Sequence, residues 1–291
     1  MNQCADKWQD YECLDAGAGE KLERWGNIIL RRPDPQALWP IQNHQTLWNH
    51  PHAHYHRSKS GGGQWEFKKK FNQTWTIGYR DLRFQIAPMG FKHTGLFPEQ
   101  AANWDFMMEQ IQKVQEPVRV LNLFAYTGGA TMACAYGGAG EVVHVDASKG
   151  MVNWAKENMR LSHLEQHKIR FIVDDVLKFV AREKRRGRTY HGIVMDPPSY
   201  GRGPGGEIWK IEDQLYPLIC ACLEILDPSP LFFLVNSYTT GFSPTVLYNI
   251  LHGTVLAAHP YGSLEAGEMG LPISATQTIL PCGIYGRWRK L

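Results

Sequence analysis

Apolar runs alternate with helix-like stretches along the second half of the chain. Five short runs are rich in valine, isoleucine, leucine and phenylalanine, and apolar residues at helical spacing follow the first four of them. Strands that are apolar throughout are typically covered by helices on both faces. The pattern predicts a Rossmann-like, doubly wound, mostly parallel α/β sheet, with strands at 118–124, 141–145, 169–173, 191–195 and 231–235 and helices at 130–136, 149–161, 176–184 and 213–226.

Residues before about position 115 show a less regular pattern, rich in aromatic residues, histidine, glycine and proline. Three short segments, at 65–71, 75–79 and 82–87, predict antiparallel strands. We therefore expect an N-terminal tail, a small N-terminal α+β accessory domain and a larger α/β domain, at residues 1–20, 21–95 and 96–291 respectively.

The composition excludes a disordered chain, because 43% of the residues are hydrophobic. A net charge of +3 neither requires nor excludes a nucleic-acid partner. Six cysteines are too few and too irregularly spaced for a disulfide framework or a zinc ribbon. We find no signal-peptide pattern and no apolar run of the roughly 18 residues that a membrane span needs. We expect a soluble, cytoplasmic protein that uses neither a membrane nor a metal.

A glycine-bearing loop follows the first strand of the α/β pattern, at residues 122–129. Glycine lets the backbone approach a ligand closely, and the helix that follows presents free N–H groups. Many sheets of this kind carry glycine here for turn geometry alone, and the dinucleotide fingerprint Gly-x-Gly-x-x-Gly is absent. The candidate ligand-binding residues of the loop are Asn122, Phe124, Tyr126, Thr127, Gly128 and Gly129.

Carboxylates follow the next two strands. Asp146, followed by Ala147 and Ser148, could accept both hydrogen bonds from a ribose diol or could cap the next helix. Asp174 and Asp175 follow the third strand, directly before Val176; one could accept an adenine amino group while the other caps a helix. The residues alone leave both alternatives open.

The strongest signal is Asp196-Pro197-Pro198-Ser199-Tyr200, which follows the fourth strand. Two prolines stop a strand, so a simple turn is one explanation. At the carboxyl end of a central strand, however, the segment faces the ligand crevice. A rigid corner there could present a carboxylate and carbonyl oxygens to an amino or ring nitrogen, and we expect this second role.

These four motifs resemble, in order and strand position, those of class I S-adenosylmethionine-dependent methyltransferases. The similarity is closest to bacterial ribosomal RNA large-subunit methyltransferases, the group that contains the 5-methylcytosine enzyme I and the 7-methylguanine enzyme K/L. The segment 93–100 also resembles one that precedes their catalytic domain. The resemblance covers about residues 75–291, and we expect the chain to be too short for the RNA-binding domain of those enzymes.

The resemblance implies a seven-stranded methyltransferase sheet and S-adenosylmethionine as the cofactor. It places Phe124, Thr127 and Gly128 at the methionine part of the cofactor. Asp146 would bind the ribose hydroxyls and Asp175 the adenine edge. The same resemblance puts Asp196 and Pro197 at the methyl group and target, and Phe97 and Gln100 at the N-terminal side of the pocket, which they would close. We expect Pro198 to belong to the same catalytic corner and Tyr200 to stack on a base. The further candidate cofactor-binding residues are Asn122, Tyr126, Gly129, Ala147, Ser148, Asp174, Val176 and Asp196.

One departure from the family changes the expected chemistry. Carbon-5 methylation of a pyrimidine requires a thiolate nucleophile, and the 5-methylcytosine enzymes carry it in a loop after the fifth strand. Here that loop, Val235–Phe242, contains no cysteine. We therefore expect direct transfer to a nitrogen of an RNA base, with ribosomal RNA as the expected substrate. The alternatives are a protein side chain or small molecule as acceptor, or a non-catalytic module that binds the cofactor and RNA. A homodimer stays open.

Two further segments carry weaker signals. Histidines cluster between His44 and His56 without a nearby cysteine or carboxylate in the sequence, and Arg57 and Lys59 follow. A metal site, a phosphate contact and a solvated loop all fit this segment, and we expect the loop. A basic run at 184–188 could be an exposed helix end or could track a nucleic-acid backbone.

Overall fold

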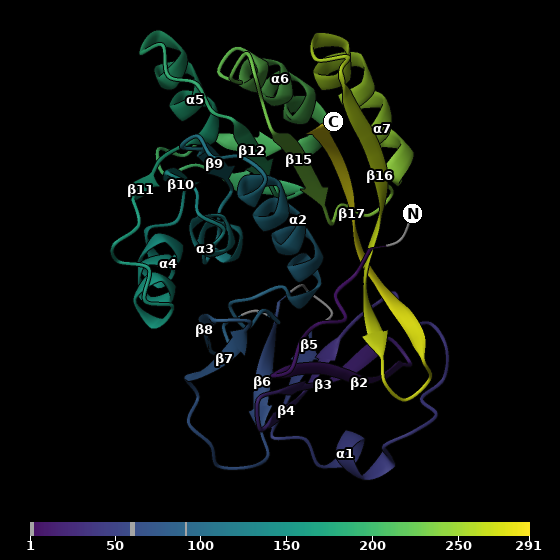
Figure 1. Cartoon of the computed structure of the whole chain (residues 1–291). Coiled ribbons are helices and arrows are strands. Elements are labelled where there is room, and N and C mark those ends of the chain that lie inside the picture. The colour runs from purple at the N-terminus through teal and green to yellow at the C-terminus, as the bar shows by residue number, and fades with distance from the viewer. Residues whose placement is uncertain (1–2, 59–61, 91) are drawn as a thin grey trace. The chain divides into compact units, whose positions relative to one another are not determined.

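The computed structural model describes residues 3–58, 62–90 and 92–291 and divides the chain into two compact units (Figure 1). One unit consists of Asn103–Glu268 and Gly283–Leu291, with the first described residue, Gln3, and we name it the sheet unit. The other consists of Cys4–Ala102 and Met269–Cys282, and we name it the N-terminal unit. Lys59, which follows the histidine segment, and residues 1 and 2 of the expected tail lie outside the described part of the chain.

The sheet unit is built on strands in the order β11-β10-β9-β12-β15-β17-β16. The pairs β11–β10, β10–β9, β9–β12 and β12–β15 are parallel, whereas β17 is antiparallel to β15. This arrangement confirms the expected mostly parallel, seven-stranded sheet. The strands are β9 (Arg119–Leu123), β10 (Glu141–Asp146), β11 (Ile169–Val173), β12 (Gly192–Met195), β15 (Phe232–Ser237), β16 (Gly262–Ile273) and β17 (Thr278–Lys290).

Helices cover both faces of this sheet, with α2, α3 and α4 on one side and α5, α6 and α7 on the other (Figure 1). None of the helices in the described residues is long and apolar enough to cross a membrane. The helices are α2 (Ala101–Gln112), α3 (Gly129–Tyr136), α4 (Lys149–Leu161), α5 (Val176–Arg185), α6 (Ile211–Leu223) and α7 (Pro244–Leu251), which continues into a π-helical turn (His252–Leu256).

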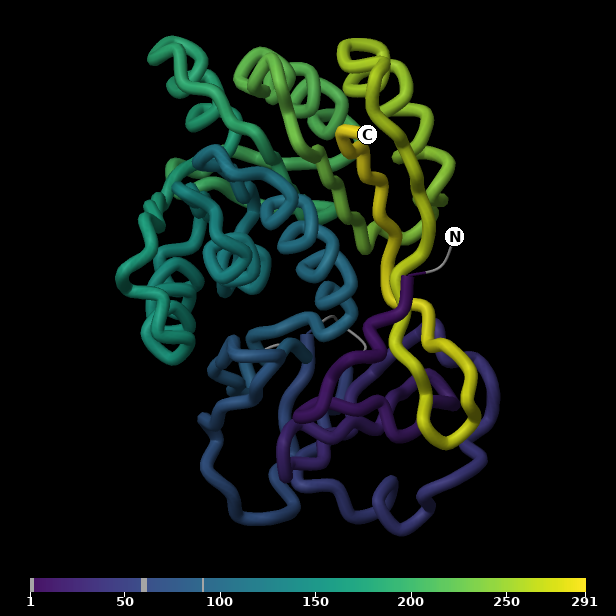
Figure 2. Tube along the Cα trace, in the orientation of Figure 1, coloured from purple at the N-terminus to yellow at the C-terminus, as the bar shows by residue number. Residues whose placement is uncertain are grey.

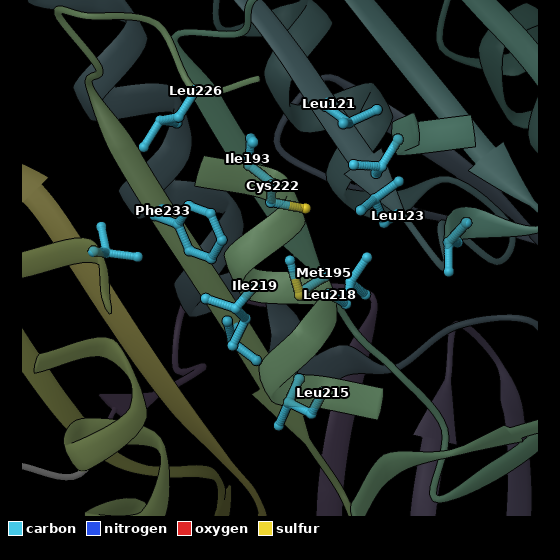
Figure 3. Packing of buried hydrophobic residues seen from close by; sticks show 14 of the residues in the cluster. Leu121, Leu123, Ile193, Met195, Leu215, Leu218, Ile219, Cys222, Leu226 and Phe233 are labelled. Atoms are coloured by element: carbon cyan, nitrogen blue, oxygen red, sulfur yellow. The ribbon is translucent and has the colours of Figure 1, made fainter. Parts of the chain in front are cut away.

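Helix α6 buries an apolar stripe against the central strands (Figure 3). Leu215, Leu218 and Cys222 recur at helical spacing and pack in one cluster with Ile193 and Met195 of β12. Each fully buried leucine of this kind contributes roughly 1.5–3 kcal/mol relative to an exposed one. The packing fixes the position of β12, which leads directly into the Asp196 corner.

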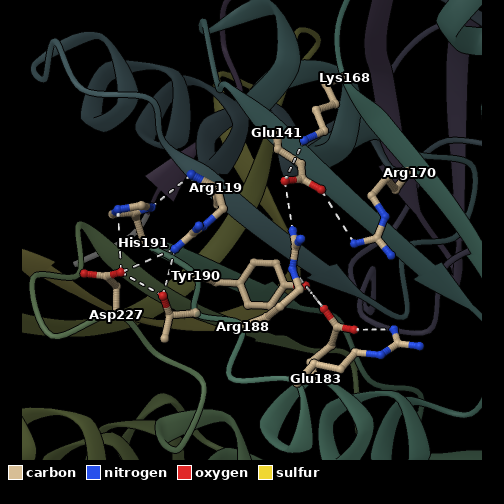
Figure 4. A network of polar contacts seen from close by, with 11 residues as sticks. Arg119, Glu141, Lys168, Arg170, Glu183, Arg188, Tyr190, His191 and Asp227 are labelled. Carbon is tan, nitrogen blue, oxygen red and sulfur yellow. Dashed lines mark hydrogen bonds and ion pairs between the residues drawn. The ribbon is translucent and has the colours of Figure 1, made fainter.

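Ion pairs hold together the amino ends of the strands (Figure 4). Glu141, the first residue of β10, contacts Arg188 at 2.9 Å, Lys168 at 3.3 Å and Arg170 at 3.6 Å. Burial by itself would raise the pKa of Glu141, but hydrogen bonds and charges from Arg188 and Lys168 outweigh it and hold that pKa below 4.5. The carboxylate of Glu183 accepts a hydrogen bond from the Tyr190 hydroxyl at 2.7 Å. The network thus ties β10 and β11 to the segment before β12.

The N-terminal unit is mostly β, and the chain returns to it at residues 269–282, the yellow segment of the trace in Figure 2. Its strands run in the order β2-β3-β4-β5-β6, with a separate β7–β8 hairpin, and Ile273 of β16 pairs with Cys13 of β2. The elements are β1 (Gln3–Cys4), β2 (Tyr11–Gly17), β3 (Glu20–Trp25), β4 (Ile28–Pro33), α1 (Gln45–Asn49), β5 (Ala53–Arg57), β6 (Gly63–Phe67), β7 (Trp75–Tyr79), β8 (Leu82–Ile86) and a 3-10 turn (Pro98–Gln100).

The two units differ from the expected linear division at 20 and 95. Residues 11–17, expected in a tail, form strand β2, and residues 269–282, expected in the α/β domain, belong to the N-terminal unit. Asp15 interrupts the apolar pattern of this strand, so the sequence does not reveal it. The residue can be buried because its carboxylate accepts hydrogen bonds from Trp48 Nε1 at 3.0 Å and from the backbone N–H groups of Ala16 and Asn43. A chain segment returning from the far end cannot be read from local pattern.

Glu141→Gln is expected to lower the free energy of unfolding by about 1–3 kcal/mol, because three cations would lose their shared carboxylate. Urea denaturation of Glu109→Gln, whose exposed pair with Lys113 should matter by less than about 0.5 kcal/mol, is the control. Because the pKa of Glu141 is lowered on folding, its contribution is present above pH 4.5 and is lost as the pH falls through the folded pKa. Equal effects of the two variants at pH 7 would contradict a stabilising network.

Candidate functional site

The loop between β9 and α3 has an unusual backbone. Phe124, Tyr126 and Gly128 all have positive φ, of 54°, 50° and 86°. Left-handed conformations at residues other than glycine are costly and persist where the surroundings enforce them. Here the enforcing contacts come from β10, because Ala125 N donates to Val145 O at 3.0 Å and Tyr126 N donates to Asp146 Oδ2 at 2.8 Å.

Asp146 joins two loops through its carboxylate. Oδ2 accepts from Tyr126 N and Oδ1 accepts from Ser148 N, each at 2.8 Å. The cap of α4 is Ser148, whose side chain accepts from Met151 N at 3.4 Å, so Asp146 is not itself the N-cap residue. Burial raises the pKa of Asp146 despite these two backbone hydrogen bonds. Each oxygen retains a lone pair for a further donor, and Ala147 lies between the two anchored residues.

Buried polar side chains support this loop from the core side, and only Asn122 among them is expected from the sequence. The Asn122 amide donates to Thr131 Oγ1 at 2.9 Å, and Thr131 in turn contacts His144 Nδ1 at 2.9 Å. Burial lowers the pKa of His144 to about 3, so the ring is neutral. Asn158 of α4 donates to Thr127 O at 2.8 Å. The sequence does carry one signal for these contacts, because Asn158 is a polar residue at a core-facing position of the amphipathic helix α4.

Close packing restricts the start of α3. A Cβ atom at Gly129 would lie 2.5 Å from the Trp104 ring, and one at Gly128 would lie 3.1 Å from Ala155 Cβ. Glycine is therefore required at Gly129 by space and at Gly128 by its positive φ as well. The turn is fixed by steric contact on the side of the protein core.

The two carboxylates after β11 have separate partners. Asp174 pairs with Arg182 at 2.5 Å and accepts a hydrogen bond from the backbone N–H of Asp175. Asp175 caps α5, because its Oδ1 accepts from Lys178 N at 3.0 Å. The second oxygen of Asp175 has no partner in the described chain. The next residue, Val176, is buried in the core.

The Asp196 corner lies directly beside the glycine loop. Met195 pairs with Leu123, and Asp196 N donates to Leu123 O at 3.4 Å. The Pro198 carbonyl accepts a hydrogen bond from Trp209 Nε1 at 2.7 Å. This contact ties the proline corner to the packed Trp209 ring. The Trp209 ring packs edge-on against the Phe124 ring, with 4.7 Å between the ring centroids. The corner and the glycine loop therefore share one packing contact.

The loop after β15 completes this edge of the sheet. Thr239 Oγ1 and Ser199 Oγ lie 2.7 Å apart, which links this loop to the Asp196 corner. Asn236 Oδ1 accepts from Asn103 Nδ2 at 2.9 Å, another buried contact that the sequence did not reveal. Burial raises the pKa of the Cys282 thiol, and this cysteine belongs to the other unit.

Phe97 and Gln100 also belong to the N-terminal unit, where Gln100 N donates to Phe97 O at 3.1 Å at the 3-10 turn. Their expected role in closing the pocket stays a prediction. Tyr200 lies in β13 (Tyr200–Arg202), a short strand paired with β14 (Ile208–Lys210), and 53% of its surface is exposed.

The histidine segment is not a single loop as expected, because it contains helix α1 and ends in strand β5. His54 and His56 lie on β5 opposite β6, and one ring nitrogen of each lies within 4.8 Å of a Glu66 carboxylate oxygen. Among the described residues this trio is the arrangement that could hold a metal ion. His56 Nε2 and a Glu66 carboxylate oxygen lie 2.8 Å apart in a hydrogen bond, and Lys68 Nζ lies 3.7 Å from the same oxygen. His54 Nε2 lies 2.7 Å from a Glu20 carboxylate oxygen, so the groups of this trio already have partners within the protein.

The strand order, the carboxylate after β10 and the proline corner after β12 define a Rossmann-like methyltransferase. Residues 46–221 match the family model of S-adenosylmethionine-dependent methyltransferases. The crystal structure of the S-adenosylmethionine-dependent methyltransferase from Agrobacterium tumefaciens is 35% identical, with a TM-score of 0.94 over 100% of this chain and 94% of that one. The chain therefore belongs to the S-adenosylmethionine-dependent methyltransferases, as its motifs indicated, and the cofactor of that family is S-adenosylmethionine.

The curated relatives are much longer than this chain, and each matches only part of it. Ribosomal RNA large subunit methyltransferase I of Enterobacter sp. (strain 638) is 42% identical over 119 residues, which are 41% of this chain and 29% of that protein. Ribosomal RNA large subunit methyltransferase K/L of Syntrophotalea carbinolica is 29% identical over 183 residues, or 62% and 25% of the two chains. The chain thus spans about a quarter of the length of these relatives.

Gly129→Ala is expected to lower the free energy of unfolding by about 1–3 kcal/mol and to weaken S-adenosylmethionine binding, because the added methyl group collides with Trp104 and displaces the loop. Gly150→Ala is the matched control, because a Cβ atom in the first turn of α4 meets only Ser148 Oγ at 3.7 Å. Calorimetric titration with the cofactor and thermal unfolding measure both. If Gly129→Ala bound the cofactor like the control, the close packing would not position the loop.

Proposed function

We propose that this protein transfers a methyl group from S-adenosylmethionine directly to a nitrogen atom of an RNA base, with ribosomal RNA as the substrate. The observation that carries the proposal is the Asp196-Pro197 corner, held beside Phe124 at the carboxyl end of β12. S-adenosylmethionine supplies an electrophilic methyl group on a sulfonium. The protein residues supply position and polarity.

The residues at the carboxyl edge fit this cofactor. The Asp146 carboxylate retains lone pairs that can accept the two ribose hydroxyls, and the open oxygen of Asp175 can accept an adenine amino group. Backbone N–H groups at the start of α3 face the same edge as the loop 124–128. Asn122 and Asn158 act in this proposal as positioning residues, since they hold the loop through Thr131 and Thr127.

At the acceptor, Asp196 and Pro197 act on the target nitrogen. The Asp196 carboxylate accepts a hydrogen bond from the target N–H group, and the Pro197 carbonyl accepts a second one. These contacts would direct the nitrogen lone pair toward the methyl carbon, so most of the acceleration comes from alignment and from stabilising the positive charge that develops on nitrogen. The new N–C bond would form as the methyl–sulfur bond breaks, with the neutral thioether as the leaving group. The proton that the nitrogen must then lose would pass along its hydrogen bond to the Asp196 carboxylate. Tyr200 stacks on the base, which must leave its helix if it is paired.

Five of the six cysteines argue against the alternative at carbon 5. That reaction needs a thiolate, but burial raises the thiol pKa of Cys13, Cys134, Cys222 and Cys282, and burial with nearby Asp6 raises that of Cys4. The loop after β15 contains no cysteine. Transfer to nitrogen needs no covalent adduct and agrees with both observations.

RNA as the acceptor is supported by the relatives, which are named as ribosomal RNA methyltransferases. Ribosomal RNA as substrate would place the enzyme in the cytoplasm, and this location is part of the proposal. The proposal leaves the oligomeric state open. Methyl transfer from labelled S-adenosylmethionine to RNA, protein and small-molecule fractions decides the acceptor class, and label confined to protein or metabolites would overturn the choice of RNA.

Asp196→Ala is expected to lower kcat by about 10²-fold or more with little change in cofactor affinity, because the variant lacks an acceptor directed at the reacting nitrogen. Cys282→Ala is the control and should remain within a few-fold of the wild type. Single-turnover transfer of labelled methyl groups to RNA measures both. An inactive Cys282→Ala enzyme that is still folded, or a fully active Asp196→Ala enzyme, would contradict direct transfer at this corner.

Asp146→Ala is expected to weaken S-adenosylmethionine binding by about 1–3 kcal/mol, the scale of a lost hydrogen bond to a charged group. The pKa of Asp146 is raised above 3.8 and only the carboxylate accepts both hydroxyls, so affinity is full at neutral pH and falls as the pH decreases through that raised pKa. Calorimetry over pH should show this decline in the wild type and not in Asp146→Asn. An unchanged dissociation constant in both variants would assign Asp146 a purely structural role.

A further inference from the structure

The hairpin that follows the catalytic corner has one packed face and one open face. Strands β13 and β14 pair with Tyr200 opposite Lys210, Gly201 opposite Trp209 and Arg202 opposite Ile208. Residues directly opposite each other point to the same side of a hairpin, and neighbours along a strand alternate. Trp209 therefore lies on one face, and the other face carries Tyr200, Arg202, Ile208 and Lys210.

The packed face fixes the hairpin to the sheet unit. Trp209 belongs to the main hydrophobic core, and its indole donates to Pro198 O at 2.7 Å. At the tip, Glu207 pairs with Lys178 of α5 and accepts from Gly205 N at 2.8 Å. At the base, Ile211 N donates to Ser199 O at 3.1 Å. The open face is thus presented on a rigid support.

The open face combines two chemical characters. Tyr200 and Ile208 are 53% and 51% exposed, so this face presents one aromatic and one aliphatic side chain to solvent. Arg202 and Lys210 flank them and are exposed too, and neither has a carboxylate partner in the chain as described. The acid of the hairpin, Glu207, is engaged with Lys178, so the four side chains of this face carry two positive charges and no negative one.

We propose that this face of the β13–β14 hairpin binds the single-stranded RNA that flanks the target nucleotide. Cations bind the phosphate backbone of any RNA, but exposed aromatic and aliphatic side chains need the face of an unstacked base, which a duplex does not offer. The hairpin begins four residues after Asp196, a span of at most about 14 Å. The nucleotides in contact are therefore those next to the base in the site.

The inference rests on the proposed function and adds a requirement on the substrate, namely that the target lies in a loop, a bulge or an opened strand. It also assigns different roles to the charged side chains of this face and to Ile208, beside Tyr200, which stacks on the target base. Arg202 and Lys210 would set affinity through phosphates, with a strong dependence on salt, whereas Ile208 would contribute a contact that salt does not screen.

The test compares two double variants by titration with a fluorescent single-stranded RNA, at several salt concentrations. Arg202→Gln with Lys210→Gln should weaken RNA binding at least about tenfold and reduce the slope of log K against log salt by about 1.4, the value for two phosphate contacts on a single strand. The control, Lys184→Gln with Arg185→Gln, removes two exposed cations of the basic run at 184–188 and should leave affinity and slope unchanged. Cofactor affinity should be the same in all three proteins.

Ile208→Ser gives a second readout, with weaker RNA binding at every salt concentration and an unchanged slope. If the hairpin variants bound and methylated RNA like the wild type, or if the Lys184/Arg185 variant carried the loss instead, the inference would be overturned while the proposed function stood. If the wild type methylated only protein or metabolites, the proposed function would fail first. A preference of the wild type for duplex over single-stranded RNA would also overturn the inference.

Discussion

Parallel strand pairing is the constraint on which the site depends. The register of β10–β9 and β9–β12 brings the carboxyl ends of three strands to one edge, so residues 124–129, Asp146 and Asp196 lie together although they span more than seventy positions of sequence. The direct evidence is a pair of backbone contacts, Tyr126 N to Asp146 Oδ2 and Asp196 N to Leu123 O. A single antiparallel strand among these three would place one of the groups at the opposite edge.

The carboxylates at the two edges of the sheet have different surroundings. At the amino edge, carboxylates such as Glu141 are surrounded by cations and have their charge satisfied within the protein. At the carboxyl edge, Asp146 is held by backbone N–H groups alone, and burial raises its pKa. A carboxylate with no cationic partner there keeps affinity for donors that a ligand brings, at some cost in stability.

The sequence predicted what depends on local pattern. Helix α4 and strands β7 and β11 have the expected bounds, because their apolar periodicity is undisturbed. It could not predict the buried contacts that hold the loop, Asn158 to Thr127 and Trp104 against Gly129, since these partners are distant in the chain. It also missed β2, where Asp15 interrupts the apolar pattern, and the long β16–β17 hairpin, whose sequence contains glycine and proline.

The central claim is direct methylation of a base nitrogen in ribosomal RNA. Its most direct test is mass spectrometry of ribosomal RNA nucleosides from a strain that lacks the gene, compared with its parent and with a complemented strain. The account predicts the loss of one N-methylated nucleoside, restored by the wild-type gene and not by an Asp196→Ala gene. An unchanged nucleoside profile, or the loss of a carbon-5-methylated pyrimidine, would contradict it.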